Sequence, residues 1–221
     1  MQWAVRAHST DTLQTCLVVY VSNHRHAEYA CEQVPINLSQ LTNLKCLNLS
    51  NNNFDISEID FSDMTQLCDL HLAGIGTLEA TTLGDRVYRL TELRVSRLNG
   101  TRLPSLPLNF GNLVKLNVLQ VDLCRLEKLP ESITRLTNLT QLLASDCEFA
   151  TLPANIGDMH ALEVVTFLTN GDDMIIPPSF LSLTRLRILH LPNDNCLVTP
   201  PGFNEYVAVL QASGCEYLQE S

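Results

Sequence analysis

The sequence predicts an α/β solenoid, with a curved parallel β-sheet on its concave face and 3₁₀ or extended segments on its convex face. Two observations lead to this prediction. The pattern LxxLxLxx(N/C/T)x(L/F) recurs along most of the 221 residues, and a shorter pattern, LPxxIxxL, lies between its copies. The first leucines of the seven clear copies are Leu44, Leu67, Leu93, Leu116, Leu139, Leu162 and Leu186, so the steps between them are 23, 26, 23, 23, 23 and 24 residues.

Each copy of the longer pattern predicts one short strand. Side chains alternate along a strand, so the two leucines of its xLxLx segment point into the core and the x residues point to the concave surface. One unit cannot bury its apolar side alone. Neighbouring units must therefore stack, and both ends of the stack need caps.

The shorter pattern predicts the return segment on the convex face. An extended or 3₁₀ segment tolerates proline because no ladder hydrogen bond is lost, and its apolar residues point back into the core. The clear examples begin at Val34-Pro35, Leu129-Pro130 and Leu152-Pro153. The unit from Leu67 to Leu93 is the longest and lacks this pattern, so we expect a bulged or locally helical outer loop over Thr81–Leu90.

The two patterns together resemble the leucine-rich-repeat family, most closely its intracellular class with 23-residue repeats, which Ras-associated scaffold proteins typify. The resemblance covers about residues 34–203 and implies a curved solenoid. We expect a single domain over 1–221, with a cap strand and loop over 1–33, seven repeats of about 23 residues over 34–198 and a carboxyl-terminal cap over 199–221.

In this family the fourth slot of the longer pattern is usually Asn, whose side chain bonds to backbone groups in the turn. Here the slot holds Asn52, Ile75, Thr101, Cys124, Cys147, Asn170 and Asp194. Cysteine is small, easily buried and a weak donor, so we assign Cys124 and Cys147 a packing role rather than a reactive one. Because this polar series is incomplete, we expect repeats two to five to be held more by packing than by side-chain hydrogen bonds.

Both ends contain candidate cap elements. Cys16–Val21 is expected to add one strand before the first repeat, followed by a polar connection over Asn23–Gln33. Pro200-Pro201 follows the last repeat strand, and we expect a helix over Phe203–Ala212. Such an end resembles the caps of intracellular family members, whereas secreted members usually show a cysteine-clustered amino cap that these residues lack.

The composition narrows the class of partner. There are 24 acidic and 14 basic residues, a formal net charge of −10, which disfavours nucleic acid and membrane surfaces and favours a basic or neutral protein surface. No run of 18 apolar residues and no secretory signal occurs. The eight cysteines are scattered without CxxC pairs, so we expect reduced thiols, no metal site and a cytoplasmic location.

No catalytic pattern occurs in the sequence. GxSxG, HExxH and the protein-kinase signatures are absent, and none of the six histidines lies beside a cysteine or serine in a recognised nucleophile context. Repeats also occupy most of the chain. We therefore expect a non-enzymatic protein without a cofactor or a small-molecule substrate.

The concave surface supplies the candidate partner-binding residues, which are His71, Arg97, Gln120, Asp122, Leu143, Thr166, Leu168 and His190. This face is polar near its amino-terminal end and becomes apolar from about Val118 to Leu168. Contiguous exposed apolar side chains mark binding surfaces. The alternative is that β-branched residues here only favour strand formation, and that the histidines and Arg97 are ordinary solvated side chains.

The first functional hypothesis is an interaction module or scaffold that binds a protein partner through the concave face. Three alternatives stay open at this point: a structural subunit of a large intracellular assembly, a substrate-recognition arm of a ubiquitin ligase or phosphatase complex, and a secreted receptor. A recognition arm needs an adaptor segment, for which residues 1–33 are short and strand-like. A secreted receptor would contain disulfides.

Overall fold

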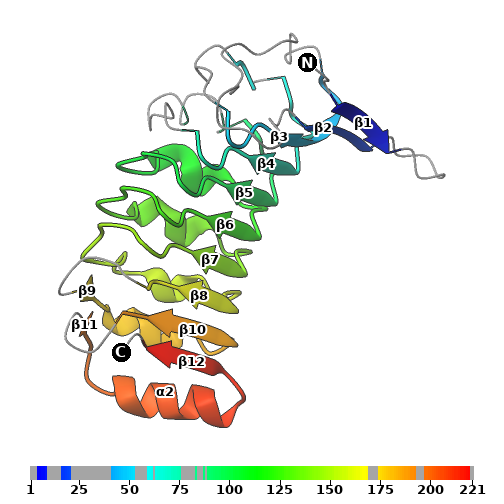
Figure 1. Ribbon diagram of the computed structural model, residues 1–221. Helices are drawn as coiled ribbons and strands as arrows, with labels where there is room; N and C mark the ends of the chain where they lie inside the picture. Colours follow the sequence, from blue (N-terminus) through cyan, green and yellow to red (C-terminus); the bar gives the residue numbers. More distant parts are fainter. Residues whose placement is uncertain are drawn as a thin grey trace.

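The computed structural model describes residues 4–8, 16–20, 41–52, 59–61, 63–75, 83, 87, 89–168, 174–192 and 197–219. In this part of the chain ten strands form one sheet, and their order in the sheet follows the sequence (Figure 1). The strands are β1 (Ala4–His8), β2 (Cys16–Tyr20), β3 (Leu44–Asn48), β4 (Asp69–His71), β5 (Val95–Arg97), β6 (Val118–Gln120), β7 (Gln141–Leu143), β8 (Val164–Thr166), β10 (Ile188–Leu191) and β12 (Glu216–Gln219).

The register of the sheet confirms the predicted solenoid. All neighbouring strands from β2 to β12 run parallel, and equivalent residues of successive repeats lie side by side, as His71 does with Arg97 and Arg97 with Gln120. The sequence does not predict β1, which is antiparallel to β2. Nor does it predict a second, two-stranded sheet of β9 (Met174–Ile175) and β11 (Leu197–Val198).

Short 3₁₀ segments cover the other face of the sheet (Figure 1). They are η3 (Leu108–Asn112), η4 (Glu131–Arg135), η5 (Ile156–Asp158) and η6 (Pro178–Ser182). Each buries an apolar residue in the core: Phe110, Ile133, Ile156 and Phe180 respectively. These turns confirm the return segments predicted after Leu129-Pro130 and Leu152-Pro153, while the one predicted at Val34-Pro35 lies outside the described residues.

Adjacent 3₁₀ turns stack so closely that two glycines are required. A Cβ added at Gly157 would lie 2.1 Å from the carbonyl oxygen of Ser179, and one added at Gly111 would lie 2.2 Å from that of Ser132. Cβ atoms essentially never lie within 3.0 Å of such an atom. The distance between the turns, rather than an unusual φ, therefore excludes larger residues at both positions.

The pattern leucines form one continuous core. The inward residues of the xLxLx segments are buried, including Leu70 and Leu72 at 0% exposed and the one polar substitute, Ser96, at 1%. Phe149 and Phe167 pack edge to face with 5.7 Å between ring centroids. Burying one such large apolar side chain contributes about 1.5–3 kcal/mol, so stacking of repeats supplies most of the stability.

Three of the fourth-slot side chains donate hydrogen bonds to backbone carbonyls. Thr101 Oγ1 donates to Leu98 O at 2.7 Å, Cys124 Sγ to the same carbonyl at 3.2 Å, and Cys147 Sγ to Val121 O at 3.3 Å. The incomplete polar series predicts that packing contributes more than side-chain hydrogen bonds in repeats two to five, and three of these four repeats nevertheless keep such a bond. Threonine and cysteine replace asparagine as donors because each still reaches a backbone carbonyl, and Ile75 alone among the described fourth-slot residues has no donor.

Both thiols in this series are buried and protonated. Burial raises the pKa of the Cys124 thiol, and it raises that of Cys147 to about 12. A thiol with a raised pKa is a poor nucleophile, which supports the predicted packing role. Cys46, Cys68 and Cys215 are thiols too, so none of the cysteines whose side chains are described forms a disulfide.

The carboxyl-terminal cap contains the predicted helix and one further strand. The helix α2 (Phe203–Ala212) buries Phe203, Val207 and Leu210. Tyr206 from the same helix donates its hydroxyl to Leu183 O at 2.9 Å. The chain then returns to the sheet as β12, which pairs in parallel with β10 and which the sequence does not predict (Figure 1).

At the amino-terminal end, β2 pairs in parallel with β3 and confirms the additional strand. Asn23–Gln33 lies outside the described residues, as do Asn170 and Asp194. In the long second unit, Leu83 and Val87 are helical and buried, in agreement with a locally helical outer loop. Among the described residues, no helix is long and apolar enough to cross a membrane.

Candidate functional site

The structure brings the eight predicted binding residues together on the outward side of the sheet. His71, Arg97, Gln120, Leu143, Thr166 and His190 form one row across β4 to β10, because each is the register partner of the next. Asp122 and Leu168 follow strands β6 and β8. All eight side chains are half-buried. With about 4.8 Å between strands, the row is about 24 Å long.

His71 and Arg97 form a polar pair near the amino-terminal end of this row. Arg97 Nη1 lies 2.9 Å from His71 Nε2. Burial lowers the pKa of His71, and the adjacent Arg97 charge lowers it further, against an opposing effect of Asp69. The neutral imidazole is thus favoured, and its Nε2 accepts a hydrogen bond that orients the guanidinium.

Asp122 is largely occupied within the protein. One of its carboxylate oxygens accepts from Gln120 Nε2 at 3.0 Å, and the other accepts from the Ser145 backbone N–H at 2.9 Å. Ser145 Oγ in turn accepts from the Leu168 N–H at 3.1 Å. Asp122 therefore connects its repeat to the next one, and Gln120 from the same repeat holds the Asp122 carboxylate in place.

Beyond this polar part lies an apolar patch, which we define as Val118, Leu143, Val164 and Leu168. All four side chains are half-buried and point outward from the sheet or its end. Valine favours strands, so Val118 and Val164 fit a purely structural explanation. Leucine has no such preference, and neither Leu143 nor Leu168 is among the partly buried apolar side chains that pack against the core.

Leu123, in the turn that follows β6, is a residue that the sequence analysis missed. Its φ is +57°, and its side chain is 63% exposed. Gly74 and Gly100 occupy the equivalent positions in two earlier repeats, also with positive φ. Leucine in this conformation costs about 1–2 kcal/mol, and the departure from glycine is the signal in the sequence that identifies it. A strained, exposed apolar residue is a candidate contact residue.

The carboxyl-terminal cap adds an acidic side chain to the same face. Glu216 of β12 lies 3.6 Å from His190 Nε2, measured to Oε1, and its side chain is 69% exposed. The sequence analysis missed this residue because it did not predict β12. His190 therefore has an acidic neighbour, unlike Arg97.

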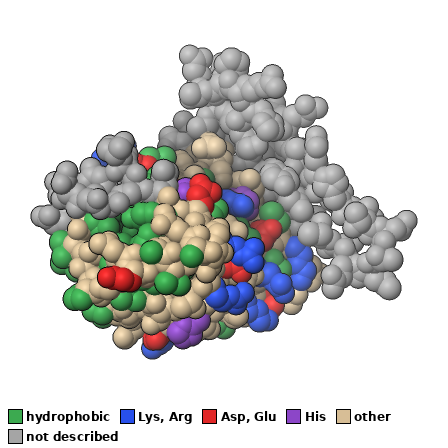
Figure 2. Space-filling model, turned by 90° about the horizontal axis from the view of Figure 1, so that it is seen from below, with side chains coloured by type: hydrophobic (Ala, Val, Ile, Leu, Met, Phe, Trp, Pro, Cys, Tyr) green, Lys and Arg blue, Asp and Glu red, His purple; other side chains and the backbone are tan. Residues whose placement is uncertain are grey.

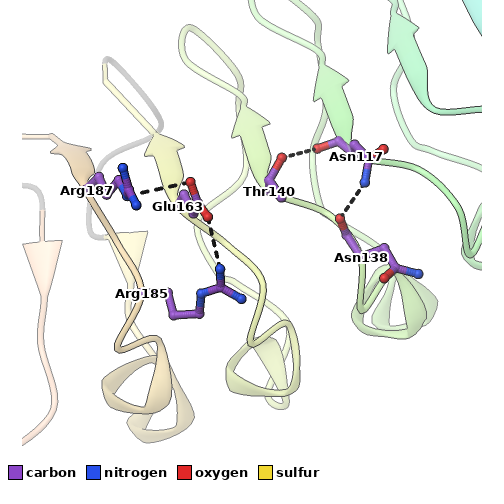
Figure 3. Close-up of polar contacts among 6 residues, drawn as sticks. All are labelled: Asn117, Asn138, Thr140, Glu163, Arg185 and Arg187. Carbon is purple, nitrogen blue, oxygen red and sulfur yellow. Dashed lines mark hydrogen bonds and ion pairs between the residues drawn. The ribbon is translucent and has the colours of Figure 1, made fainter.

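A charged flank lies beside the sheet, next to the start of each strand (Figure 3). Glu163 contacts Arg185 at 3.2 Å and Arg187 at 3.7 Å, and Asn117 Nδ2 donates to Asn138 O at 3.0 Å. Exposed ion pairs of this kind contribute about 0–1 kcal/mol each, so they support the stacking of repeats only weakly. Figure 2 shows Lys and Arg side chains gathered along one side, away from the largely uncharged end of the molecule.

No catalytic or metal-binding arrangement is found in the described part of the chain. No group of three His, Cys, Asp or Glu side chains there is placed to hold a metal ion. A cavity of about 420 Å³ lies in the carboxyl-terminal cap, where Leu197, Phe203, Val207 and Tyr217 line it. It contains no pair of titratable groups suited to acid–base chemistry, and it is separate from the concave row.

Comparison with known proteins gives the family and the fold. Residues 70–197 match the family described as leucine-rich repeat region. A search of curated proteins finds no match. Among solved structures, a leucine-rich-repeat protein of Leptospira interrogans is similar, with a TM-score of 0.66 and 25% identity over 83% of this chain and 44% of that one.

Two further structures share the fold at lower identity. The Arabidopsis receptor kinase HAESA, solved in complex with the peptide hormone IDA and the co-receptor SERK1, has a TM-score of 0.68 and 21% identity over 96% of this chain and 35% of that one. An internalin of Listeria monocytogenes, InlF, has a TM-score of 0.58 and 24% identity over 92% and 59%. The chain spans less than half of the Leptospira and HAESA proteins. Since the family match covers more than half of its residues and the repeat geometry agrees, the chain belongs to the leucine-rich-repeat family.

Proposed function

We propose that this chain is a non-catalytic protein-interaction module that holds a protein partner against its concave face, mainly over β6 to β10. The apolar patch is the observation that carries the proposal. Leu143 and Leu168 point outward and are only half-buried, and the exposed, strained Leu123 follows the neighbouring strand β6. Apolar contacts at the centre of an interface with polar groups around it are typical of protein-binding surfaces.

Family members of the same fold support this kind of function. HAESA was solved with a peptide hormone and a co-receptor bound, so a leucine-rich-repeat domain in that protein holds polypeptide partners. Other neighbours, such as the internalin, are proteins of a different kind on the same scaffold. One scaffold serves many partners, so the partner of this chain follows from its own surface residues.

The test introduces a charge into the apolar patch. Leu143→Arg places a cation at a half-buried outward position, and we expect captured partners to lose at least tenfold in affinity while the fold survives. Leu108→Arg is the matched control, since Leu108 is 76% exposed on η3 of the convex face. Affinity capture with mass spectrometry compares the two variants with wild type. Partners that stay bound to Leu143→Arg, or are lost equally from both variants, would refute the proposal.

We also propose a cytoplasmic location and the intracellular class of repeats. Five described cysteines form no disulfide, and two of them are buried in the fourth slot, which supports this assignment. Counting reactive thiols after denaturation of the native protein tests it. All eight cysteines should be alkylated without prior reduction, and a smaller count would reveal disulfides and contradict a reducing compartment.

A further inference from the structure

The Arg97 guanidinium is a half-buried cation on the concave face. Among the described residues, no Asp or Glu oxygen lies within 4.0 Å of it, although Lys115, Arg185, Arg187 and His190 all have such a neighbour. Its one side-chain hydrogen bond goes to the imidazole of His71. Arginine has five N–H donors, so most of its capacity is available to a group from outside the chain.

The surroundings of Arg97 favour a single carboxylate over a phosphate. The planar guanidinium matches a carboxylate through two parallel hydrogen bonds. Asp69 and Asp122 lie on the same face, and the chain carries a net charge of −10, so a multiply charged anion meets repulsion that a single carboxylate largely avoids. The hydrogen bond to His71 Nε2 restrains the guanidinium and uses one of its five donors.

The distance from Arg97 to the apolar patch determines how far apart an acidic and an apolar residue must be in a peptide segment that contacts both. Arg97 on β5 and Leu143 on β7 occupy the same row two strands apart, which corresponds to about 10 Å. An extended peptide rises about 3.3 Å per residue. Side chains on one side of an extended segment are two or four positions apart, about 7 or 13 Å, so an acidic and a large apolar residue at either spacing reach both sites through their flexible side chains.

We propose that Arg97, oriented by His71, donates hydrogen bonds to the carboxylate of an Asp or Glu side chain of the protein partner. A nearby apolar residue of the same partner segment packs on Leu143. This inference rests on the proposed function and specifies the partner: a segment that is both acidic and apolar. Its acidic end lies over β5, and its apolar end lies over β7 and β8. The chain thus selects an acidic segment despite its own negative charge.

A randomised dodecapeptide library displayed on phage, selected on the full chain, supplies defined probes for this site. We expect the selected peptides to contain Asp or Glu with a large apolar residue two or four positions away, on the same side of an extended segment. Affinities measured by fluorescence anisotropy should fall about 10- to 100-fold for Arg97→Gln, as expected for a charge-assisted hydrogen-bonded pair. Arg94→Gln, an exposed arginine three residues earlier, removes the same charge and should change affinity less than threefold.

A double-mutant cycle isolates the contact. Replacing the peptide's acidic residue with its amide should weaken binding to wild type as much as Arg97→Gln does, and should have no further effect on the Arg97→Gln variant. Arg97→Lys keeps the charge without the two-pronged geometry and should lose an intermediate factor. This variant and the peptide amide give the same test if Arg97→Gln folds poorly.

The outcomes separate the two proposals. Peptides that lose affinity with Leu143→Arg but not with Arg97→Gln or the amide substitution would overturn this inference and leave the concave-face function standing. Peptides insensitive to both changes, or a selection that returns no binder sensitive to either, would overturn both.

Discussion

Gly157→Ala tests whether the convex turns stack as closely as described. An added Cβ would lie 2.1 Å from Ser179 O and 2.8 Å from Ser179 C, so the η5 and η6 turns must separate by about 0.9 Å to restore even a 3.0 Å contact. The Ser179 hydroxyl also donates to Ala154 O at 2.6 Å, which holds the two turns together. Overpacking of this kind costs about 1–3 kcal/mol.

The sign of the effect makes the prediction decisive. Where space is available and φ is negative, replacing glycine with alanine stabilises a protein by about 0.4–1 kcal/mol, because the unfolded chain loses freedom. We expect the opposite here, with a fall in melting temperature of about 2–12 °C for a domain of this size. Hydrogen exchange should show the loss of protection centred on η5 and η6, because repeats mainly stabilise their neighbours.

Asp158→Ala is the control, since Asp158 is exposed in the same turn and its removal should change stability by less than about 0.5 kcal/mol. Thermal and urea denaturation of the three proteins provide the measurement. An unchanged or increased stability of Gly157→Ala would refute the close stacking of the turns.

Three further predictions concern single side chains of the concave face and the core. Folding lowers the pKa of His71, so the stability that the neutral imidazole contributes is complete above the ordinary pKa of 6.5 and declines as the pH falls below it. As the pH is lowered from about 7.5 to about 5, the urea midpoint should therefore fall more steeply for wild type than for His71→Gln. Equal dependence of the two midpoints on pH would contradict this prediction. Leu123→Gly should raise stability by about 1 kcal/mol, because φ is +57°, while weakening partner binding; a loss of stability would show that Leu123 packs. Native Cys147, with its pKa raised to about 12, should resist iodoacetamide at neutral pH until the protein unfolds, and rapid labelling followed by mass spectrometry would show otherwise.

The sheet was predictable because its determinants are local. Leucines spaced as in Leu70 and Leu72 repeat in register, and alternation along a strand then assigns the outward row without any knowledge of tertiary contacts. β12 could not be predicted in this way, because Glu216–Gln219 contains a single leucine and pairs with β10 only after α2 reverses the chain. The pairing of β12 depends on tertiary contacts rather than on a local pattern, and Glu216, which lies on β12, was not predicted for the same reason.

The roles of the site residues were less predictable than their positions. Asp122 lies in the outward row as expected, yet its carboxylate is held by the backbone of the next repeat at Ser145. The sequence of one repeat does not show which polar side chains reach the next one. Cys147 stands where the family usually has asparagine, and its thiol still donates a hydrogen bond to a backbone carbonyl, that of Val121.

Chemical-shift mapping of the full chain with a captured partner or a selected peptide tests the central claim most directly. The proposal that the concave face binds a protein segment predicts that the largest backbone shifts fall on β5 to β8 and on Leu123 and Leu168. Shifts confined to η3–η6 on the convex face, or to α2 and its cavity, would contradict it.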